Sequence, residues 1–383
     1  MGAHHSVVRR QTTRGAVGEK PSSSRRERLS GFDGLRAIAA LIVVSSHILV
    51  IGFPPGFFHG LPSLFTNALT AGAGSGIFFA LSGFFNTGSL LSRRDRTATL
   101  GAFYRHFWTR RGLRIFPLYF VFLLMVFAAG SQSPSEIPWM VYAAMLQNWY
   151  IGLGYEPRTM TVFTWSLAVD TQFFLLWPAV VWFCTRNRLK WGALAIFIVS
   201  VPIRYYVLIH YGSVAAYTFL CTRMGGLALG GLACVLVQEK HVLATRIIPR
   251  VTPYFLTVAV LLMGSGTMGR GDFFPTVVGY PYLAVTWTFL VVTVRQQSPA
   301  LIGALEWWPL KTVGLASYGV YLLHAIALSL VVGTMLRIGI YAGDSWAVMA
   351  MYPLLVCGLT AVLVCIARPF EKWCISWEDR LAP

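Results

Sequence analysis

"DGLRAIAALIVVSSHILV", residues 33–50, is an apolar stretch of nearly the length that a helix needs to cross a bilayer. It nevertheless begins with Asp33 and Arg36 and carries His47 within it. Arg36 and His47 are eleven residues apart, so on an α-helix they share one face, roughly 16 Å apart along the axis. An ionisable side chain inside a membrane helix is costly and typically faces a polar cavity or a functional site.

The rest of the chain has the composition of a membrane protein. Of its 383 residues 56% are hydrophobic and 12% are charged, with a mean hydropathy of +0.62, whereas soluble domains are about 25% charged. Eleven apolar runs lie near 34–52, 72–92, 115–131, 137–152, 162–184, 191–210, 217–237, 251–267, 275–294, 312–334 and 346–367. We therefore predict an all-α polytopic protein embedded in a lipid bilayer.

The positions of lysine and arginine indicate which runs cross. Cytoplasmic loops carry an excess of these residues. If 137–152 lies flat or re-enters on the outer side, every basic loop residue except Arg158, Arg270 and Arg337 falls on the cytoplasmic side. The pattern favours about ten transmembrane helices with both termini cytoplasmic, although the sequence leaves open whether 137–152 crosses.

Three segments are expected along the chain. Residues 1–31 are polar, basic and aperiodic, which predicts a disordered cytoplasmic tail. Residues 32–374 form the membrane domain, and 375–383 form a short C-terminal tail.

The same composition excludes several classes of protein. The formal net charge of +17 comes from basic residues that cluster in the short segments between apolar runs. No nucleic-acid recognition module is found among them, so we exclude nucleic acid as a partner. The six cysteines lie in or beside apolar runs without a C-x-x-C pair, so we expect buried thiols and no metal site. Neither a P-loop nor a strand-linked G-x-G-x-x-G is present, so we expect no bound nucleotide cofactor.

Several short blocks resemble those of the acyltransferase 3 family of integral-membrane acyltransferases. The blocks are, in chain order, FDGLRAIAALIVVSSHI (32–48), GIFFALSGFF (76–85), TRRGLRIFPLYF (109–120), TWSLAVDTQFFLLWP (164–178), ASYGVYLLHA (316–325) and ARPFEKW (367–373). The resemblance implies about ten transmembrane helices and transfer of an acyl group, commonly acetyl, from cytoplasmic acyl-CoA to a hydroxyl. It also implies that His47 is the essential histidine and that Arg36 is its partner.

His47 and Asp170 are the predicted catalytic residues. An imidazole is suited to taking a proton from a hydroxyl near neutral pH, and Asp170 is a candidate for steadying the charged ring. The sequence leaves other readings open. His47 could become acylated or simply bond a neighbouring helix, and Asp170 could balance an arginine. The chain has Thr171 where the family often has a second acid, so a mechanism that needs both acids is in doubt.

Arg36, Arg111 and Arg114 are predicted to bind the acyl-CoA phosphates, because arginine pairs with phosphate through a planar fork of donors. The alternative is that the arginines of the basic loop at 93–114 set the membrane topology and contact lipid headgroups. We expect the pantetheine arm to follow the helix face from Arg36 to His47.

Ser82, Gly83, Gln172 and Arg223 are candidate contacts of a channel or of the acceptor. For each of them a structural role is the alternative: Gly83 could allow close helix packing and Gln172 could link two helices. His324 and Tyr318 lie in a family-like block, where a structural role is at least as well supported.

These observations predict a multi-pass enzyme of a bacterial inner or plasma membrane, with acetyl-CoA as co-substrate and a glycan or exported saccharide as acceptor. The alternatives are acyl transfer to a secondary metabolite such as a macrolide, and a proton-coupled transporter or flippase. The last family-like block ends near residue 374, so we expect the membrane domain to complete the transfer alone or with a partner. The acyl chain length and the oligomeric state cannot be read from the sequence.

Overall fold

The computed structural model describes residues 30–51, 67, 72–128, 136–268, 273–296, 299–340 and 346–381. Nearly all of these residues are helical, and across them no strand forms beyond an isolated bridge between Glu136 and Glu156. The predicted all-α class is therefore confirmed. Most of the predicted disordered tail, residues 1–29, lies outside the described residues.

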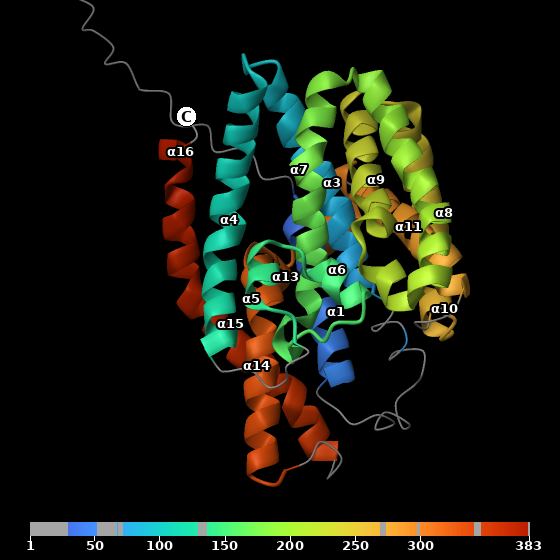
Figure 1. The fold of residues 1–383 in the computed structure, drawn as a ribbon. Helices are drawn as coiled ribbons and strands as arrows, with labels where there is room; N and C mark the ends of the chain where they lie inside the picture. The colour runs from blue at the N-terminus through green and yellow to red at the C-terminus, as the bar shows by residue number, and fades with distance from the viewer. Residues whose placement is uncertain are drawn as a thin grey trace, which may run out of the picture.

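Nine helices in the described part of the chain are long and apolar enough to cross a membrane. They are α1 (Phe32–Ile51), α4 (Leu100–Ala128), α7 (Trp165–Phe183), α8 (Arg186–Thr218), α9 (Leu220–Gln238), α10 (Ile248–Gly264), α11 (Tyr280–Arg295), α14 (Ser317–Arg337) and α15 (Trp346–Ser376). The π-helical turns η3 (Leu243–Ile247) and η4 (Phe274–Gly279) directly precede α10 and α11 and complete these two spans. A tenth, α3 (Ala73–Arg94), has 22 residues but is more polar. It packs among α1, α9 and α11 in the middle of the bundle (Figure 1), so ten long helices match the predicted number.

Two of these helices meet through glycine. A Cβ added at Gly83 of α3 would overlap the carbonyl oxygen of Leu227 in α9, and one at Gly230 would overlap the carbonyl oxygen of Ala80. Small residues let membrane helices approach this closely. By contrast, large apolar side chains such as Leu124, Leu176 and Ile366 are exposed, as expected on faces that meet lipid.

Residues 139–152 fold as two short helices, α5 (Trp139–Ala143) and α6 (Gln147–Gly152), joined through Met145 with a φ of 55°. Neither helix approaches the roughly 20 residues that crossing requires. The segment is anchored by Tyr142, which is fully buried and accepts a hydrogen bond from Thr161. Burial raises the pKa of this phenol. The prediction that 137–152 is not a full crossing agrees with this fold.

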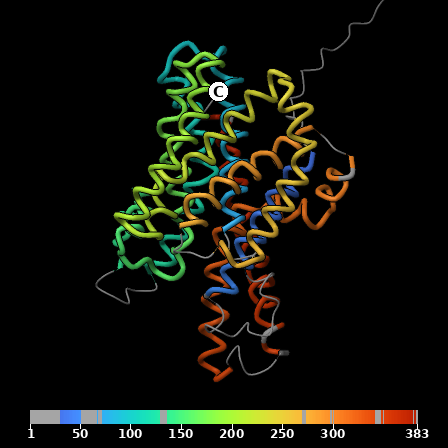
Figure 2. Tube along the Cα trace, turned by 90° about the vertical axis from the view of Figure 1, so that its right-hand side faces the viewer, coloured from blue at the N-terminus to red at the C-terminus, as the bar shows by residue number. Residues whose placement is uncertain are grey.

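The basic loops gather at one end of the bundle. Arg94 donates to the carbonyl oxygens of Val181 and Cys184, and Lys190 pairs with Glu239 at 2.8 Å. These contacts join the connections after α3, α7 and α9 at one end, which lies at the top of Figure 1. At the opposite end, the hairpin of α14 and α15 extends beyond the other helices, as Figure 2 shows. That the basic end faces the cytoplasm remains a prediction.

The start of α1 is clasped by two short helices, α12 (Pro299–Leu305) and α13 (Trp308–Leu315). A Cβ at Gly34 would overlap the carbonyl oxygen of Leu305, and one at Gly314 would overlap that of Asp33. Between these helices Glu306 accepts a hydrogen bond from the backbone N–H of Gly31 at 2.6 Å, and together with Lys311 this bond lowers the pKa of the carboxyl. The clasp fixes the turn that carries Arg36.

Candidate active site

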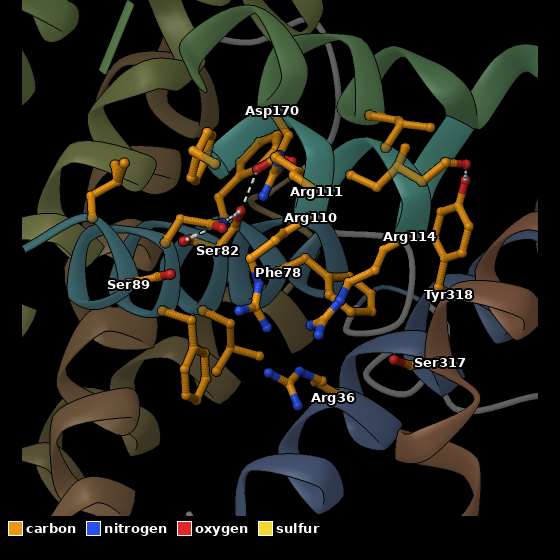
Figure 3. Close-up of a pocket in the computed structure, with 18 of the residues that line it drawn as sticks. Arg36, Phe78, Ser82, Ser89, Arg110, Arg111, Arg114, Asp170, Ser317 and Tyr318 are labelled. Atoms are coloured by element: carbon orange, nitrogen blue, oxygen red, sulfur yellow. Dashed lines mark hydrogen bonds and ion pairs between the residues drawn. The ribbon is translucent and has the colours of Figure 1, made fainter. Parts of the chain in front are cut away.

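A cavity of about 460 Å³ lies between α3, α4, α7 and α14, beside the first turns of α1. Its apolar part is formed by Phe78, Phe79, Leu81, Phe85, Phe103 and Phe107, and five arginines also line it: Arg36, Arg93, Arg110, Arg111 and Arg114. In Figure 3 the side chains of Arg36, Arg110 and Arg114 converge on one side of this space. A basic rim beside an apolar interior suits a polyanion that carries a long uncharged arm.

Arg111 and Asp170 form a largely buried ion pair inside this cavity. Their side chains are 10% and 14% exposed, and the second carboxylate oxygen of Asp170 accepts a hydrogen bond from Ser82 Oγ. The guanidinium of Arg111 also lies 4.5 Å from the ring centroid of Phe174. Asp170 therefore holds α4 and α3 against α7 and fixes the position of Arg111.

Arg110 and Arg114, one helical turn apart on α4, both pair with Glu378. Glu378 begins α16 (Glu378–Leu381), and its side chain is 7% exposed. This contact lies within the predicted short C-terminal tail, residues 375–383, because α15 continues to Ser376 and the chain then turns back onto α4. Arg114 keeps 56% of its side chain exposed and remains accessible to an anion.

Arg36 faces the same cavity from α1. It pairs with Asp33 at 2.8 Å and lies 4.8 Å from the ring centroid of Phe85. The structure thus brings Arg36, Arg111 and Arg114, the three predicted donor-binding arginines, to one cavity. It adds Arg110 and Arg93, which the sequence analysis did not single out.

His47 lies against a second histidine. Its Nδ1 is 2.7 Å from Nε2 of His324 in α14, and the two rings are nearly parallel, with centroids 5.0 Å apart. Phe163, in the short helix η2 (Thr159–Thr164), packs on both rings. The His324 side chain is completely buried.

The hydrogen bonds of this histidine pair define its proton positions when both rings are neutral. Nδ1 of His324 lies 3.1 Å from the carbonyl oxygen of Val320, which can only accept, so this nitrogen carries a proton. Nε2 of His324 is then an acceptor, and Nδ1 of His47 must donate to it. The basic nitrogen of His47 is therefore Nε2, and the bond to His324 positions it.

His47 lines a second, smaller cavity of about 50 Å³. Ser166 and Tyr321 line both cavities, and their hydroxyl oxygens lie 2.9 Å apart. The expectation that a pantetheine arm follows one continuous helix face from Arg36 to His47 is therefore too simple. The two residues face neighbouring cavities that share a wall of two hydroxyl side chains.

The predicted pairing of Asp170 with His47 is not seen. Asp170 bonds to Ser82 and Arg111, while His47 bonds to His324. Its contacts agree with the alternative interpretation, in which Asp170 balances the charge of an arginine. A mid-membrane carboxylate pairs with the nearest cation, and the basic motif of α4 supplies one.

Of the four candidate channel or acceptor contacts, Ser82 alone lines the large cavity. Gly83 lies at the crossing of α3 and α9. Gln172 donates to the carbonyl oxygen of Met145 and to Asn148, so it fastens α7 to the α5–α6 segment. Arg223 is buried beside the small cavity, where it donates to Ser75.

The sequence analysis held a structural role for His324 to be at least as well supported as a functional one, and it did not single out Ser166, Tyr321 or Glu378. The signal for His324 was present, because it is an ionisable residue inside an apolar run, as His47 is. No comparable signal marked Glu378 in a charged terminal segment. In the part of the chain that the structure describes, no three His, Cys, Asp or Glu side chains cluster to hold a metal ion.

Comparison with known proteins agrees with this arrangement. Residues 29–368 match the family described as "Acyltransferase domain". The chain belongs to the acyltransferase 3 family. This match covers the membrane helices and both cavities.

The relatives found by sequence are bacterial. The chain is 26% identical over 331 residues to the putative peptidoglycan O-acetyltransferase YrhL of Bacillus subtilis, covering 77% of this chain and 48% of that protein. It is 24% identical over 339 residues to the peptidoglycan O-acetyltransferase OatA of Listeria monocytogenes, covering 78% and 49%. The chain therefore spans about half the length of these relatives. No solved structure matches it.

Proposed function

We propose that this protein is a multi-pass O-acyltransferase of a bacterial plasma membrane, which moves an acetyl group from acetyl-CoA to a hydroxyl of a glycan or exported saccharide. The observation that carries the proposal is the shared wall between an arginine-lined cavity and a pocket that holds a hydrogen-bonded histidine pair. Membership of the acyltransferase 3 family supports the reaction class. The names of the relatives, which are peptidoglycan O-acetyltransferases, support a glycan acceptor.

The large cavity fits the donor. Arg36, Arg110 and Arg114 converge where the phosphates of CoA would bind, and the phenylalanine-lined interior would accept the pantetheine arm. Arg111 is already neutralised by Asp170, so we assign it to shaping the cavity more than to binding phosphate. Phosphates would compete with Glu378 for Arg110 and Arg114.

The thioester would then lie at the wall formed by Ser166 and Tyr321. Nε2 of His47 takes the proton of the acceptor hydroxyl, and the resulting oxygen attacks the thioester carbonyl carbon. A C–O bond forms and the C–S bond breaks. The CoA thiolate leaves and receives the proton from the His47 imidazolium, so the histidine returns to its starting state.

His324 supports this step without a carboxylate. When His47 becomes an imidazolium, its Nδ1–H still donates to Nε2 of His324, and the Nδ1–H of His324 still donates to the Val320 carbonyl oxygen. This chain of hydrogen bonds holds the ring in the orientation and tautomer that leave Nε2 for the acceptor.

The test is transfer of radiolabelled acetate from acetyl-CoA to saccharide acceptors by membranes that contain the protein. We expect His47→Ala to abolish transfer while protein level and membrane insertion are unchanged. The matched control is His210→Ala, because His210 is an exposed histidine of α8 that contacts the ring of Tyr206 and lines neither cavity. Full transfer by His47→Ala would refute the assignment.

A further inference from the structure

Two arginines are buried together at the end of the bundle opposite the basic loops. Arg223 lies in the first turn of α9, and Arg204 of α8 donates to the carbonyl oxygen of the adjacent Thr222. Their exposed fractions are only 7% and 5%. Both guanidinium groups lie over the ring of Tyr280, at 5.3 and 5.8 Å from its centroid, so the two positive charges are close neighbours.

No carboxylate of the described residues pairs with either arginine. The Nε atoms of both, and one terminal nitrogen of Arg204, are buried without a hydrogen-bond acceptor. By contrast, Arg111 of the large cavity is paired with Asp170. Two adjacent buried cations without a counter-charge are costly, which indicates a site that an anion completes.

The aromatic surroundings of Arg223 hold the cation but leave its Nε–H without an acceptor. Its guanidinium lies between 4.8 and 5.4 Å from the ring centroids of Phe79, Trp165, Tyr217 and Tyr280. Aromatic faces attract a cation through their quadrupole, yet they accept N–H groups poorly. The cage therefore fixes the guanidinium beside a space that still lacks an acceptor.

The small cavity of His47 lies on the other side of residues that contact Arg223. Ser75, Trp165 and Tyr217 line this cavity and also contact Arg223, which donates to Ser75 Oγ at 3.3 Å. A volume of about 50 Å³ holds a few water-sized groups. It admits a carboxylate or a hydroxymethyl arm, and it is too small for a whole sugar ring.

We infer that Arg223, with Arg204 behind it, binds a carboxylate of the acceptor next to His47, so that the preferred acceptors are acidic saccharides. The hydroxyl of Ser75, which now donates to the Gly72 carbonyl oxygen at 3.0 Å, would turn to the carboxylate. Binding neutralises the buried cations and brings a neighbouring hydroxyl of the same sugar towards Nε2 of His47. This inference rests on the proposed function and specifies its acceptor.

The experiment compares methyl glucuronoside with methyl glucoside. The two sugars differ only in that the glucuronoside carries a carboxylate where the glucoside carries a hydroxymethyl group. The full-length protein in lipid nanodiscs is assayed for acetyl transfer from labelled acetyl-CoA and, separately, for thermal stabilisation by each sugar without donor. We expect the wild type to prefer the glucuronoside by roughly tenfold or more, the scale of a charge-assisted hydrogen bond. The sugar with the carboxylate should also raise the unfolding temperature more.

Arg223→Gln should remove this preference in both assays, and Arg223→Lys should restore part of it, because the charge returns without the planar fork. The matched control is Arg337→Gln, which removes an exposed arginine at the end of α14. Equal use and equal binding of the two sugars by the wild type would overturn the inference, as would an unchanged preference in Arg223→Gln. If no sugar is acetylated but the glucuronoside still stabilises the wild type selectively, the proposed reaction fails and the anion site stands.

Discussion

Nδ1 of His47 in α1 and Nε2 of His324 in α14 are 2.7 Å apart, although 277 positions separate them in the chain. The contact joins the first membrane helix to the ninth of the ten long ones, and Phe163 covers both rings. It orients His47 in a pocket where the described residues place no carboxylate beside it.

The first prediction concerns His324 as a positioning residue. His324→Ala removes the acceptor that holds Nδ1–H of His47, so the wrong tautomer and ring orientation become populated. We expect kcat for acetyl transfer to fall by roughly 10²-fold, with the KM for acetyl-CoA changed less than twofold, because the donor cavity is intact. Steady-state kinetics with His210→Ala as the control measure both constants. A change confined to KM would contradict the positioning role.

The second prediction concerns the ion pair of Arg111 and Asp170. Asp170→Asn leaves a buried guanidinium uncompensated, which typically costs about 3–5 kcal/mol of unfolding free energy. The single variant Arg111→Met and the double variant Arg111→Met with Asp170→Asn complete a double-mutant cycle, and the double variant, which lacks both charges, should recover most of that loss. Thermal unfolding in detergent measures the stability of the wild type and of each variant. If the two single variants and the double variant lose stability additively, the pair is not coupled as the structure indicates.

The sequence predicted the helices well because their signal is local. Apolar runs and the positions of basic loops follow from the cost of placing polar groups in hydrocarbon, and they identified ten long helices and the short segment 137–152. Even α3, whose hydropathy is diluted by Ser82 and Asn86, was recognised from its run.

Pairings between helices were harder to predict. The sequence analysis singled out Arg111 and Arg114 from one motif and Arg36 from the start of α1, and all three line the large cavity. The partners of Asp170 and His47, by contrast, depend on which helices pack together, and no periodicity encodes this. Asp170 faces α4 and α3, and His47 faces α14. Glu378 illustrates the same limit, because nothing in a short charged segment indicates that it returns to α4.

The third prediction concerns Glu378, which occupies the arginines that would bind donor phosphate. Glu378→Gln removes this competitor, so we expect the KM for acetyl-CoA to fall about threefold, a modest change because Arg114 is half exposed and screened. Arg114→Gln should raise the same KM. The matched control is Glu239→Gln, since Glu239 pairs with Lys190 away from both cavities. A higher KM in Glu378→Gln would show that Glu378 orients the arginines for the donor instead of competing with it.

The fourth prediction separates packing from channel formation at Gly83. Its missing side chain allows α3 to lie against the backbone of α9 at Leu227, so Gly83→Val must push the two helices apart. We expect a loss of about 1–3 kcal/mol in unfolding free energy, the usual cost of overpacking, with the KM values of the correctly folded fraction unchanged. Gly101→Ala is the control, because nothing lies within 4 Å of a Cβ at that position of α4. It should be neutral or slightly stabilising, since alanine favours a helix over glycine. If Gly83→Val instead keeps full stability and raises the KM for the acceptor, the residue borders the substrate path and the packing assignment is wrong.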